Sequence, residues 1–167
     1  MSKRKRVRAY IDGNNLYRGV QEQGWALDYK RFRKYLDHKF GVEKAYLFMG
    51  MIPRNAGLYR DLENWGYTMI FKTTLPDGGG GVKGNCDGEM ILQAVSEFYE
   101  NQYDEAVVVS GDGDFGCLVN FLKGKGALRR VISPNSKTCS ILLKQIEGVK
   151  ITMLDERGLI EKLKFQK

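Results

Sequence analysis

The fold is decided by the stretch VVVSGDGDFGCL at residues 107–118. Three consecutive valines are too short and too uniformly apolar for one face of a helix, so residues 107–109 predict a fully buried strand of a parallel sheet. Phe115, Leu118 and Leu122 then recur at helical spacing, which places the glycines and aspartates between them in a strand-to-helix turn. In open α/β sheets, ligands bind at such turns.

Two carboxylates stand in this turn, Asp112 and Asp114. Their small neighbours allow a substrate or an ion to approach closely, and a hard divalent cation takes oxygen ligands of this kind. The alternative is that one of the two aspartates only caps the helix that follows, because aspartate is among the preferred N-cap residues. The turn by itself supports both interpretations equally.

The start of the chain repeats this layout. Residues 7–11 predict a strand that ends at Asp12, and Leu16 and Val20 predict a helix directly after it. Helices are further expected at residues 29–39, 56–65, 87–99, 136–146 (capped by Ser136) and 155–164, and strands at residues 44–50, 67–71, 128–132 and 150–154. This alternation of strands and helices predicts an α/β fold with a parallel sheet covered by helices.

Size and charge limit the organisation of the chain. A chain of 167 residues, of which 43% are hydrophobic, is long enough for one compact domain with a substantial core. We expect a basic N-terminal tip at residues 1–6, the domain itself at residues 7–154, and a C-terminal helix within residues 155–167. The net charge of +7 is concentrated in the first eight residues and favours a polyanion such as nucleic acid. The alternative for the basic tip is a solvated, frayed terminus.

The cysteines and the hydropathy pattern exclude several classes of protein. Cys86, Cys117 and Cys139 are widely separated and lack Cys-x-x-Cys spacing, which supports neither a disulfide framework nor a structural zinc site. No apolar run approaches the roughly 18 residues of a membrane span, and no signal-peptide core follows the basic start. We therefore expect a soluble, cytoplasmic protein with no membrane partner.

Residues 72–85 form the one long irregular stretch, with four consecutive glycines at residues 78–81. The glycines lack Gly-x-Gly-x-x-Gly spacing and no helix follows them directly, so a dinucleotide-binding fingerprint is excluded. We interpret the stretch as a flexible surface loop, with a flap over a site as the alternative.

Four aspartates are candidates for a common site. Asp87 begins a predicted helix, where it and Glu89 also interact favourably with the helix dipole, so a purely structural role is the alternative. If the first and fourth strands are neighbours, four side chains converge at the switch point of the sheet: Asp12, Asp87, Asp112 and Asp114. Two carboxylates about 4 Å apart repel by roughly 4 kcal/mol at an effective dielectric near 20, so such a cluster needs protons or cations. Oxygen ligands without a nearby histidine select Mg²⁺ or Mn²⁺.

Three motifs in this sequence resemble, in their order, the signature blocks of the NYN domain family, a branch of the PIN-like ribonucleases with a LabA-like subgroup. They are IDGNNLY at residues 11–17, KGNCDGEMIL at residues 83–92 and VSGDGDF at residues 109–115. The resemblance covers roughly residues 7–154 and implies a PIN-like, three-layer α/β/α sandwich with a mainly parallel sheet and strand one beside strand four. The glycine stretch before Lys83 is longer than the family pattern.

The resemblance also implies roles for individual residues. The catalytic and metal-binding positions would be Asp12, Asp87, Asp112 and Asp114, holding Mg²⁺ or Mn²⁺. Asn15, Glu89 and Ser110 would support them. Arg8, Lys72 and Lys83 would bind the nucleic-acid backbone, the alternative for each being a solvated surface side chain.

The leading functional prediction is a metal-dependent endoribonuclease that hydrolyses phosphodiester bonds of single-stranded or structured RNA. The alternative is a catalytically weak or inactive RNA-binding or regulatory module of the same fold, which the net charge serves equally well. A homodimer is a further expected assembly. A phosphatase of the haloacid dehalogenase type is disfavoured, because its chemistry needs a second aspartate two positions after Asp12 and residue 14 is asparagine.

Overall fold

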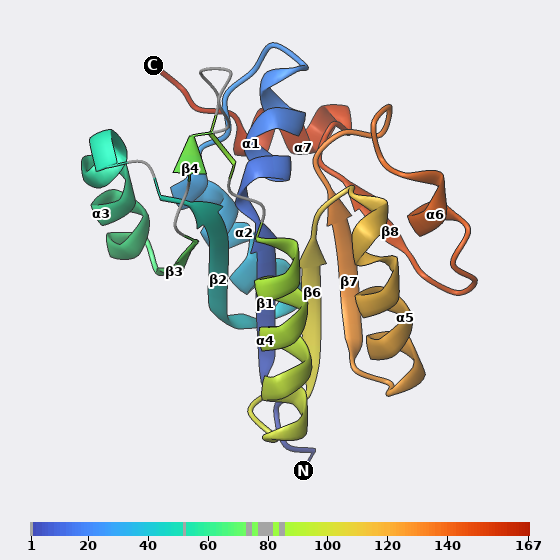
Figure 1. Ribbon diagram of the computed structural model, residues 1–167. Helices are drawn as coiled ribbons and strands as arrows, with labels where there is room; N and C mark the ends of the chain where they lie inside the picture. The colour runs from blue at the N-terminus through green and yellow to red at the C-terminus, as the bar shows by residue number, and fades with distance from the viewer. Residues whose placement is uncertain (1, 52, 73–74, 77–81, 84–85) are drawn as a thin grey trace.

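A parallel six-stranded sheet forms the centre of the computed structural model, which describes residues 2–51, 53–72, 75–76, 82–83 and 86–167 (Figure 1). Its strands are β1 (Val7–Asp12), β2 (Val42–Gly50), β3 (Tyr67–Lys72), β6 (Glu105–Val109), β7 (Leu128–Ser133) and β8 (Ile151–Met153). They lie in the order β3-β2-β1-β6-β7-β8, and every neighbouring pair is parallel. Two short strands, β4 (Leu75–Pro76) and β5 (Val82–Lys83), form a separate antiparallel pair.

Helices cover both faces of the sheet and complete the three layers that the sequence predicts. The helices are α1 (Gly13–Gln21), α2 (Tyr29–Phe40), α3 (Ala56–Asn64), α4 (Asp87–Tyr99), α5 (Gly116–Gly124), α6 (Ile141–Lys144) and α7 (Arg157–Leu163), with short 3-10 turns η1 (Pro53–Asn55) and η2 (Gly113–Phe115). Buried side chains of α1, α2, α3 and α7 pack in one core, and those of α4, α5 and α6 pack in the other. The predicted α/β/α sandwich is therefore confirmed (Figure 1).

The alternation of side chains along β1 separates these two cores. Ala9 and Ile11 belong to the core beneath α1 and α2, whereas Tyr10 belongs to the core beneath α4. The neighbouring strand β6 is buried at every residue, as a central parallel strand requires. Ile11 pairs with Val109, so the residues that follow β1 and β6 emerge side by side at the carboxyl edge of the sheet. This is the switch point where the strand order reverses.

The predicted helix that begins at Ser136 is wrong. Only α6, of four residues, forms in this region, and its N-cap is Ser140, whose side chain accepts a hydrogen bond from the backbone N–H of Leu142 at 3.2 Å. Ser136 donates its hydroxyl to Asp155 at 2.5 Å and its backbone N–H to the same carboxylate at 3.0 Å. Ser136 therefore joins the segment before α6 to the chain after β8, a long-range role that local spacing does not reveal.

The predicted irregular stretch at residues 72–85 is described only in part. Lys72 ends β3, and residues 75–76 and 82–83 form the β4–β5 pair. The four glycines at residues 78–81, on which the loop and flap interpretations depend, lie outside the described residues.

The basic N-terminal segment is anchored by acidic side chains near the start of β6. The Lys5 ammonium pairs with Glu105 at 2.5 Å, and the Arg6 guanidinium pairs with Asp104 at 2.9 Å. Hydrogen bonds from the side chain and then the backbone N–H of Arg6 lower the pKa of Asp104 to about 2. These ion pairs neutralise part of the positive charge of the basic tip and attach it to the fold.

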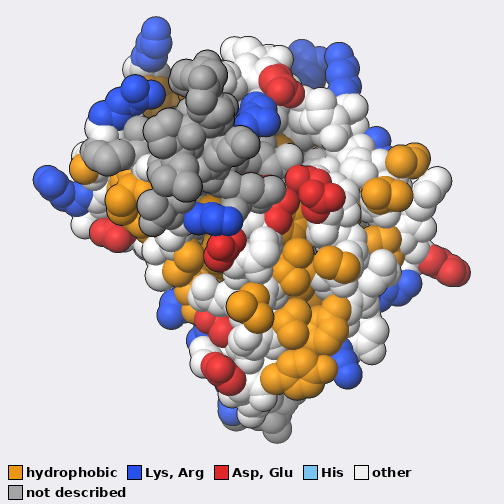
Figure 2. Space-filling model, viewed as in Figure 1, with side chains coloured by type: hydrophobic (Ala, Val, Ile, Leu, Met, Phe, Trp, Pro, Cys, Tyr) orange, Lys and Arg blue, Asp and Glu red, His pale blue; other side chains and the backbone are white. Residues whose placement is uncertain are grey.

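The surface in Figure 2 shows exposed apolar side chains over α4 and α5, below a compact group of acidic side chains. Leu92 and Tyr99 of α4 are among the most exposed of these apolar residues, at 68% and 66%. Within the described residues, no helix combines the length and the apolar character that crossing a bilayer requires.

Candidate metal centre

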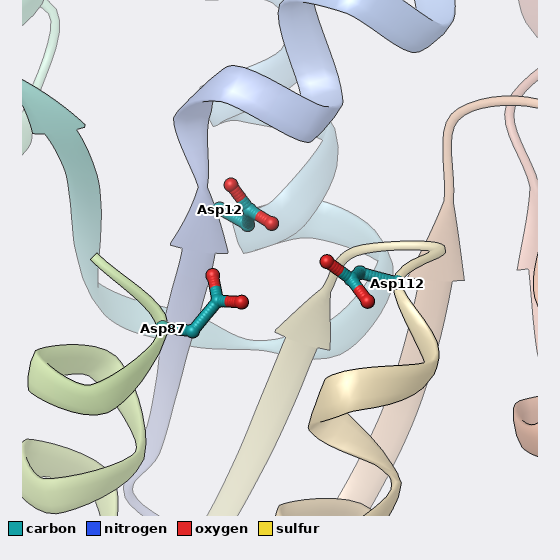
Figure 3. A group of neighbouring side chains, drawn as sticks. All are labelled: Asp12, Asp87 and Asp112. Atoms are coloured by element: carbon teal, nitrogen blue, oxygen red, sulfur yellow. The ribbon is translucent and has the colours of Figure 1, made fainter. Parts of the chain in front are cut away.

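Three aspartates from separate elements converge at the carboxyl edge of the sheet. Asp12 ends β1, Asp87 begins α4, and Asp112 lies between β6 and η2. One carboxylate oxygen from each lies within 4.8 Å of the other two, and all three residues are half-buried. Figure 3 shows the three side chains pointing toward one another. The sequence-based expectation that carboxylates distant along the chain would meet here agrees with this geometry for these three residues.

Asp12 is held in place by two hydrogen bonds. Its carboxylate caps α1 by accepting the backbone N–H of Asn15 at 3.2 Å, and it accepts the hydroxyl of Ser110 at 3.1 Å. The pKa of Asp12 is raised to about 6. Burial is the largest cause, the charges of Asp87 and Asp112 also raise the pKa, and the two hydrogen bonds lower it. The folded protein thus disfavours a charged Asp12 unless a positive charge lies nearby.

Asp112 is oriented by its own turn. Its carboxylate accepts the backbone N–H of Asp114 at 2.9 Å and caps η2, while its backbone N–H donates to the Ser110 hydroxyl at 3.1 Å. Ser110 therefore contacts both Asp12 and Asp112. The side-chain carbonyl of Asn15 accepts the N–H of Gly111 at 2.8 Å and joins the same two turns a second time.

Two glycines allow these turns to approach their neighbours closely. A Cβ atom on Gly111 would lie 2.6 Å from the hydroxyl oxygen of Ser133, and a Cβ atom on Gly13 would lie 2.8 Å from the backbone oxygen of Phe48. Both distances are shorter than a packed side chain tolerates. Packing thus requires glycine at residue 13, directly after Asp12, and at residue 111, directly before Asp112.

Asp114 lies outside the group of three. Its side chain is exposed in η2, and its contribution to the cluster is the backbone hydrogen bond to Asp112. Glu89, in the first turn of α4, pairs with the ammonium of Lys72 at 3.4 Å. The side chain of Lys83 lies outside the described residues.

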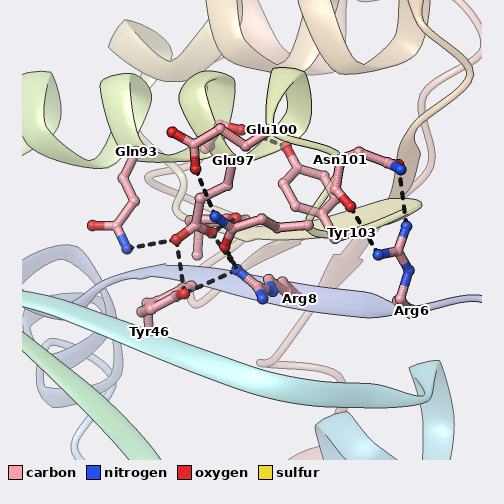
Figure 4. Close-up of polar contacts among 11 residues, drawn as sticks. Arg6, Arg8, Tyr46, Gln93, Glu97, Glu100, Asn101 and Tyr103 are labelled. Carbon is pink, nitrogen blue, oxygen red and sulfur yellow. Dashed lines mark hydrogen bonds and ion pairs between the residues drawn. The ribbon is translucent and has the colours of Figure 1, made fainter.

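Arg8 does not reach the aspartates. Its guanidinium donates to Glu97 at 2.8 Å, to the amide oxygen of Gln102 at 2.9 Å and to the hydroxyl of Tyr46 at 3.1 Å (Figure 4). Its side chain is only 18% exposed. All three contacts are made by its Nη1 nitrogen, which is therefore occupied within the fold, and binding of the nucleic-acid backbone by Arg8 stays a prediction.

A hollow of about 390 Å³ opens beside the aspartates. Besides the three aspartates, its lining includes Asn14, Asn15, Arg18 and Thr138. Arg18 is exposed and was not predicted from the sequence, although it follows Asn15 by three residues on the same helix and so shares its face. It brings a positive charge to a hollow whose floor is acidic.

The donor set of this hollow fits a metal ion. Its three converging ligands are carboxylates, and hard divalent cations bind oxygen ligands. The only histidine, His38, lies exposed on α2 and is not part of the group. A cation would also favour the charged form of Asp12, against the burial and the neighbouring charges of Asp87 and Asp112 that raise its pKa.

Comparisons with known proteins agree with these observations. The family model of the NYN domain matches residues 6–148. The low amplitude and bright protein LabA of Synechococcus elongatus is 30% identical over an alignment of length 167, which covers 94% of this chain and 88% of that protein. A crystal structure of a protein of unknown function from Vibrio parahaemolyticus has the same fold, with a TM-score of 0.75 and 20% identity over 99% of this chain and 100% of that chain. The resemblance carried by the three motifs is confirmed: the chain belongs to the NYN domain family.

Proposed function

We propose that this protein is a metal-dependent endoribonuclease in which Asp12, Asp87 and Asp112 hold Mg²⁺ or Mn²⁺. The observation that carries the proposal is the convergence of three carboxylates within 4.8 Å at the switch point of a nuclease-like fold. At about 4 Å and an effective dielectric near 20, each pair of charges repels by roughly 4 kcal/mol. A divalent cation removes this repulsion, and an all-oxygen donor set favours Mg²⁺ or Mn²⁺ over zinc or copper.

The residues of the hollow divide the work of binding and orienting the substrate. A bound divalent ion would supply an activated water molecule and offset the negative charge on the reacting phosphodiester. Ser110 and Asn15 fix the directions of Asp12 and Asp112. Arg18 attracts the RNA phosphate to the hollow, and Lys72 and Lys83 bind the nucleic-acid backbone. Asp114 has a peripheral role, because its backbone orients Asp112 while its carboxylate faces solvent.

The test is cleavage of end-labelled RNA in Mg²⁺ or Mn²⁺, with and without EDTA. Asp12→Asn and Asp112→Asn should each lower the cleavage rate by more than about 100-fold, because even residues that only orient metal ligands cost up to that factor. Asp37→Asn, an exposed aspartate of α2, is the matched control and should cleave normally. Cleavage that survives both active-site substitutions, or that persists in EDTA, would exclude this mechanism.

A second candidate function is RNA binding without catalysis. The net charge of +7 favours it as much as it favours the nuclease. It predicts binding that weakens steeply with salt, with a logarithmic slope of about −0.7 per phosphate contacted on a single strand, and no cleavage in any metal. The same cleavage assay, run beside a binding assay, separates the two functions.

A further inference from the structure

A second, larger hollow lies across the first turn of α1 from the aspartates. Its volume is about 920 Å³. Gly13, the residue after Asp12, forms part of its wall, and Asn14 lines both hollows. Five aromatic side chains contribute to the lining: Tyr17, Tyr29, Tyr59, Trp65 and Phe165. The aromatic hollow and the hollow of the proposed metal centre therefore adjoin at Asn14.

Two of these rings are exposed although their backbones are fixed. Tyr17 is 58% exposed on α1, and Phe165 is 60% exposed after α7. The N–H of Phe165 donates to the carbonyl of Ala26 at 2.8 Å, and Lys164 forms an antiparallel bridge with Leu27. The C-terminal segment is thus attached to the segment before α2 and holds the ring of Phe165 at the hollow. Ordered, exposed aromatic rings around a hollow are typical of a binding surface.

The charges at this hollow favour an anionic ligand. The exposed cations Arg54 and Lys30 line it. Among the described residues of the lining, Asp28 supplies the one carboxylate. It accepts the backbone N–H of Arg31 at 3.0 Å and lies 3.5 Å from the Arg31 guanidinium. Aromatic faces together with peripheral cations are what single-stranded nucleic acids bind, because bases stack on the rings and phosphates contact the cations.

We propose that this hollow receives an unpaired nucleobase of the RNA whose phosphate lies at the aspartates, with the base stacked against Tyr17 and Phe165. This proposal rests on the proposed function for the position of the phosphate, and it narrows the substrate to single-stranded RNA. A base within a duplex is stacked on both faces and paired along one edge, so it cannot enter the hollow. The volume lies within the range of about 300–1,000 Å³ that is typical of ligand pockets, and a nucleoside fits it. Arg54 and Lys30 contact the backbone on either side of that base.

The experiment measures binding of a single-stranded oligoribonucleotide that carries 2-aminopurine, a fluorescent base quenched by stacking, in EDTA to prevent cleavage. Tyr17→Ala and Phe165→Ala should each weaken binding by about 5- to 150-fold and reduce the quenching, as expected from the loss of one base–aromatic stack. Tyr17→Phe should retain both affinity and quenching, because the ring remains. Tyr99→Ala, which removes an exposed tyrosine of α4, is the matched control and should bind as the wild type does.

A second oligonucleotide separates stacking from charge. Replacing the fluorescent base by an abasic site should weaken binding to the wild type more than binding to Tyr17→Ala, because that variant has already lost one of the two stacks. Blunt duplex RNA of the same length should bind all variants equally. Unfolding midpoints of the variants should match the wild type, since both rings are largely exposed.

Several results would overturn this inference. They are unchanged affinity in both alanine variants, an equal loss in Tyr99→Ala, absence of single-strand binding by the wild type, or a dimer of this chain that Tyr17→Ala dissociates. The proposed function is tested independently. A wild type that never cleaves RNA but shows the expected binding pattern retains the base site and loses the nuclease. If Tyr17→Ala and Phe165→Ala bind RNA as the wild type does and cleave it normally with metal, the nuclease is retained and the base site is lost.

Discussion

Two regions of this protein bury carboxylates along the same strand, with opposite electrostatic results. At the carboxyl end of β1, Asp12 lies beside Asp87 and Asp112, and its pKa rises to about 6. Nearer the start of β1, the buried Glu97 of α4 has a pKa below its ordinary value. Burial raises the pKa in both places, so burial alone does not explain the difference.

The difference lies in the donors. Glu97 accepts hydrogen bonds from the hydroxyls of Tyr10 and Tyr46, from the Arg8 guanidinium and from the amide of Gln93 (Figure 4). These donors outweigh the effect of burial and keep the carboxylate charged. Asp12 receives two neutral donors and faces two further carboxylates. A buried carboxylate with a complete set of donors stabilises the fold, whereas a buried group of carboxylates is arranged for a cation.

The largest effect should come from the third aspartate. Asp87→Asn should lower RNA cleavage by more than about 100-fold in Mg²⁺, because it removes a proposed metal ligand. The cleavage rate of correctly folded protein, with Asp37→Asn as control, checks this. In EDTA the same substitution should not lower the free energy of unfolding by more than about 1 kcal/mol, since the lost interaction with the helix dipole is offset by relieved repulsion. A marked loss of stability in EDTA would mean that the aspartates are structural, as Glu97 is.

The complementary substitution is Glu97→Gln. It leaves the half-buried Arg8 without its carboxylate, and breaking such a pair typically lowers the free energy of unfolding by about 3–5 kcal/mol. Urea denaturation measures this loss, and Glu100→Gln, an exposed carboxylate at the end of the same helix, is the control. Cleavage per folded molecule should stay at the wild-type level. A specific loss of cleavage without loss of stability would contradict the division between the two regions.

The two regions should also respond to pH in opposite directions in EDTA. The pKa of Asp12 is raised from 3.8 to about 6, so the folded state binds its proton more tightly than the unfolded state does. Stability should therefore increase by up to about 3 kcal/mol as the pH falls from 7 to 4. Asp12→Asn should remove this increase. Thermal unfolding followed across this pH range measures it, and a wild-type curve parallel to that of Asp12→Asn would contradict the assignment.

Below this range the sign reverses because of Glu97. Its folded-state pKa is lowered, so its contribution to stability is present above the ordinary value of 4.5 and is lost as the pH falls through the folded value. The wild type and Asp12→Asn should both lose stability there, and Glu97→Gln should lose less.

Divalent metal should stabilise the folded protein through the three aspartates and not through Glu97. A ligand at 100 times its Kd raises the free energy of unfolding by about 2.7 kcal/mol. Saturating Mn²⁺ should therefore raise the unfolding midpoint of the wild type and of Glu97→Gln, but not that of Asp12→Asn. Equal shifts in all three proteins would place the ion elsewhere.

The smallest effect should come from Asp114→Asn. Its exposed side chain lies outside the converging group, so we expect cleavage within about tenfold of the wild type, the lower limit for residues that only support metal ligands. A loss as large as that of Asp112→Asn would bring Asp114 into the metal site. Initial cleavage rates under saturating Mg²⁺ distinguish the two results.

The sequence was sufficient where local patterns coincide with the sheet. The buried valines predicted a central parallel strand, and the family resemblance implied that it lies beside β1. Because parallel strands bring their carboxyl ends to one edge, the aspartates after these two strands were expected to share one site. Side-chain partners distant in the chain were not predictable. The contact of Arg8 with Glu97, 89 residues away, was not apparent from the sequence, and neither was the contact of Ser136 with Asp155, 19 residues away.

The aromatic hollow was also beyond the sequence. Its lining joins α1, the start of α2, α3 and the C-terminal segment, and backbone contacts of that segment with Ala26, Leu27 and Asp28 bring Phe165 to it. Arg18, in contrast, could have been predicted from the sequence, because it follows Asn15 by three residues on α1 and so lies on the same helix face.

The alternation of side chains in β1 has one further consequence. Arg8, Tyr10 and Asp12 are spaced by two, so they project from the same face of the strand, two toward Glu97 and one toward Asp87 and Asp112. Inserting or deleting one residue between them would move some of these side chains to the opposite face of the sheet. The residues that stabilise the fold and the proposed metal ligand thus lie on one strand of six residues, and their spacing cannot change independently.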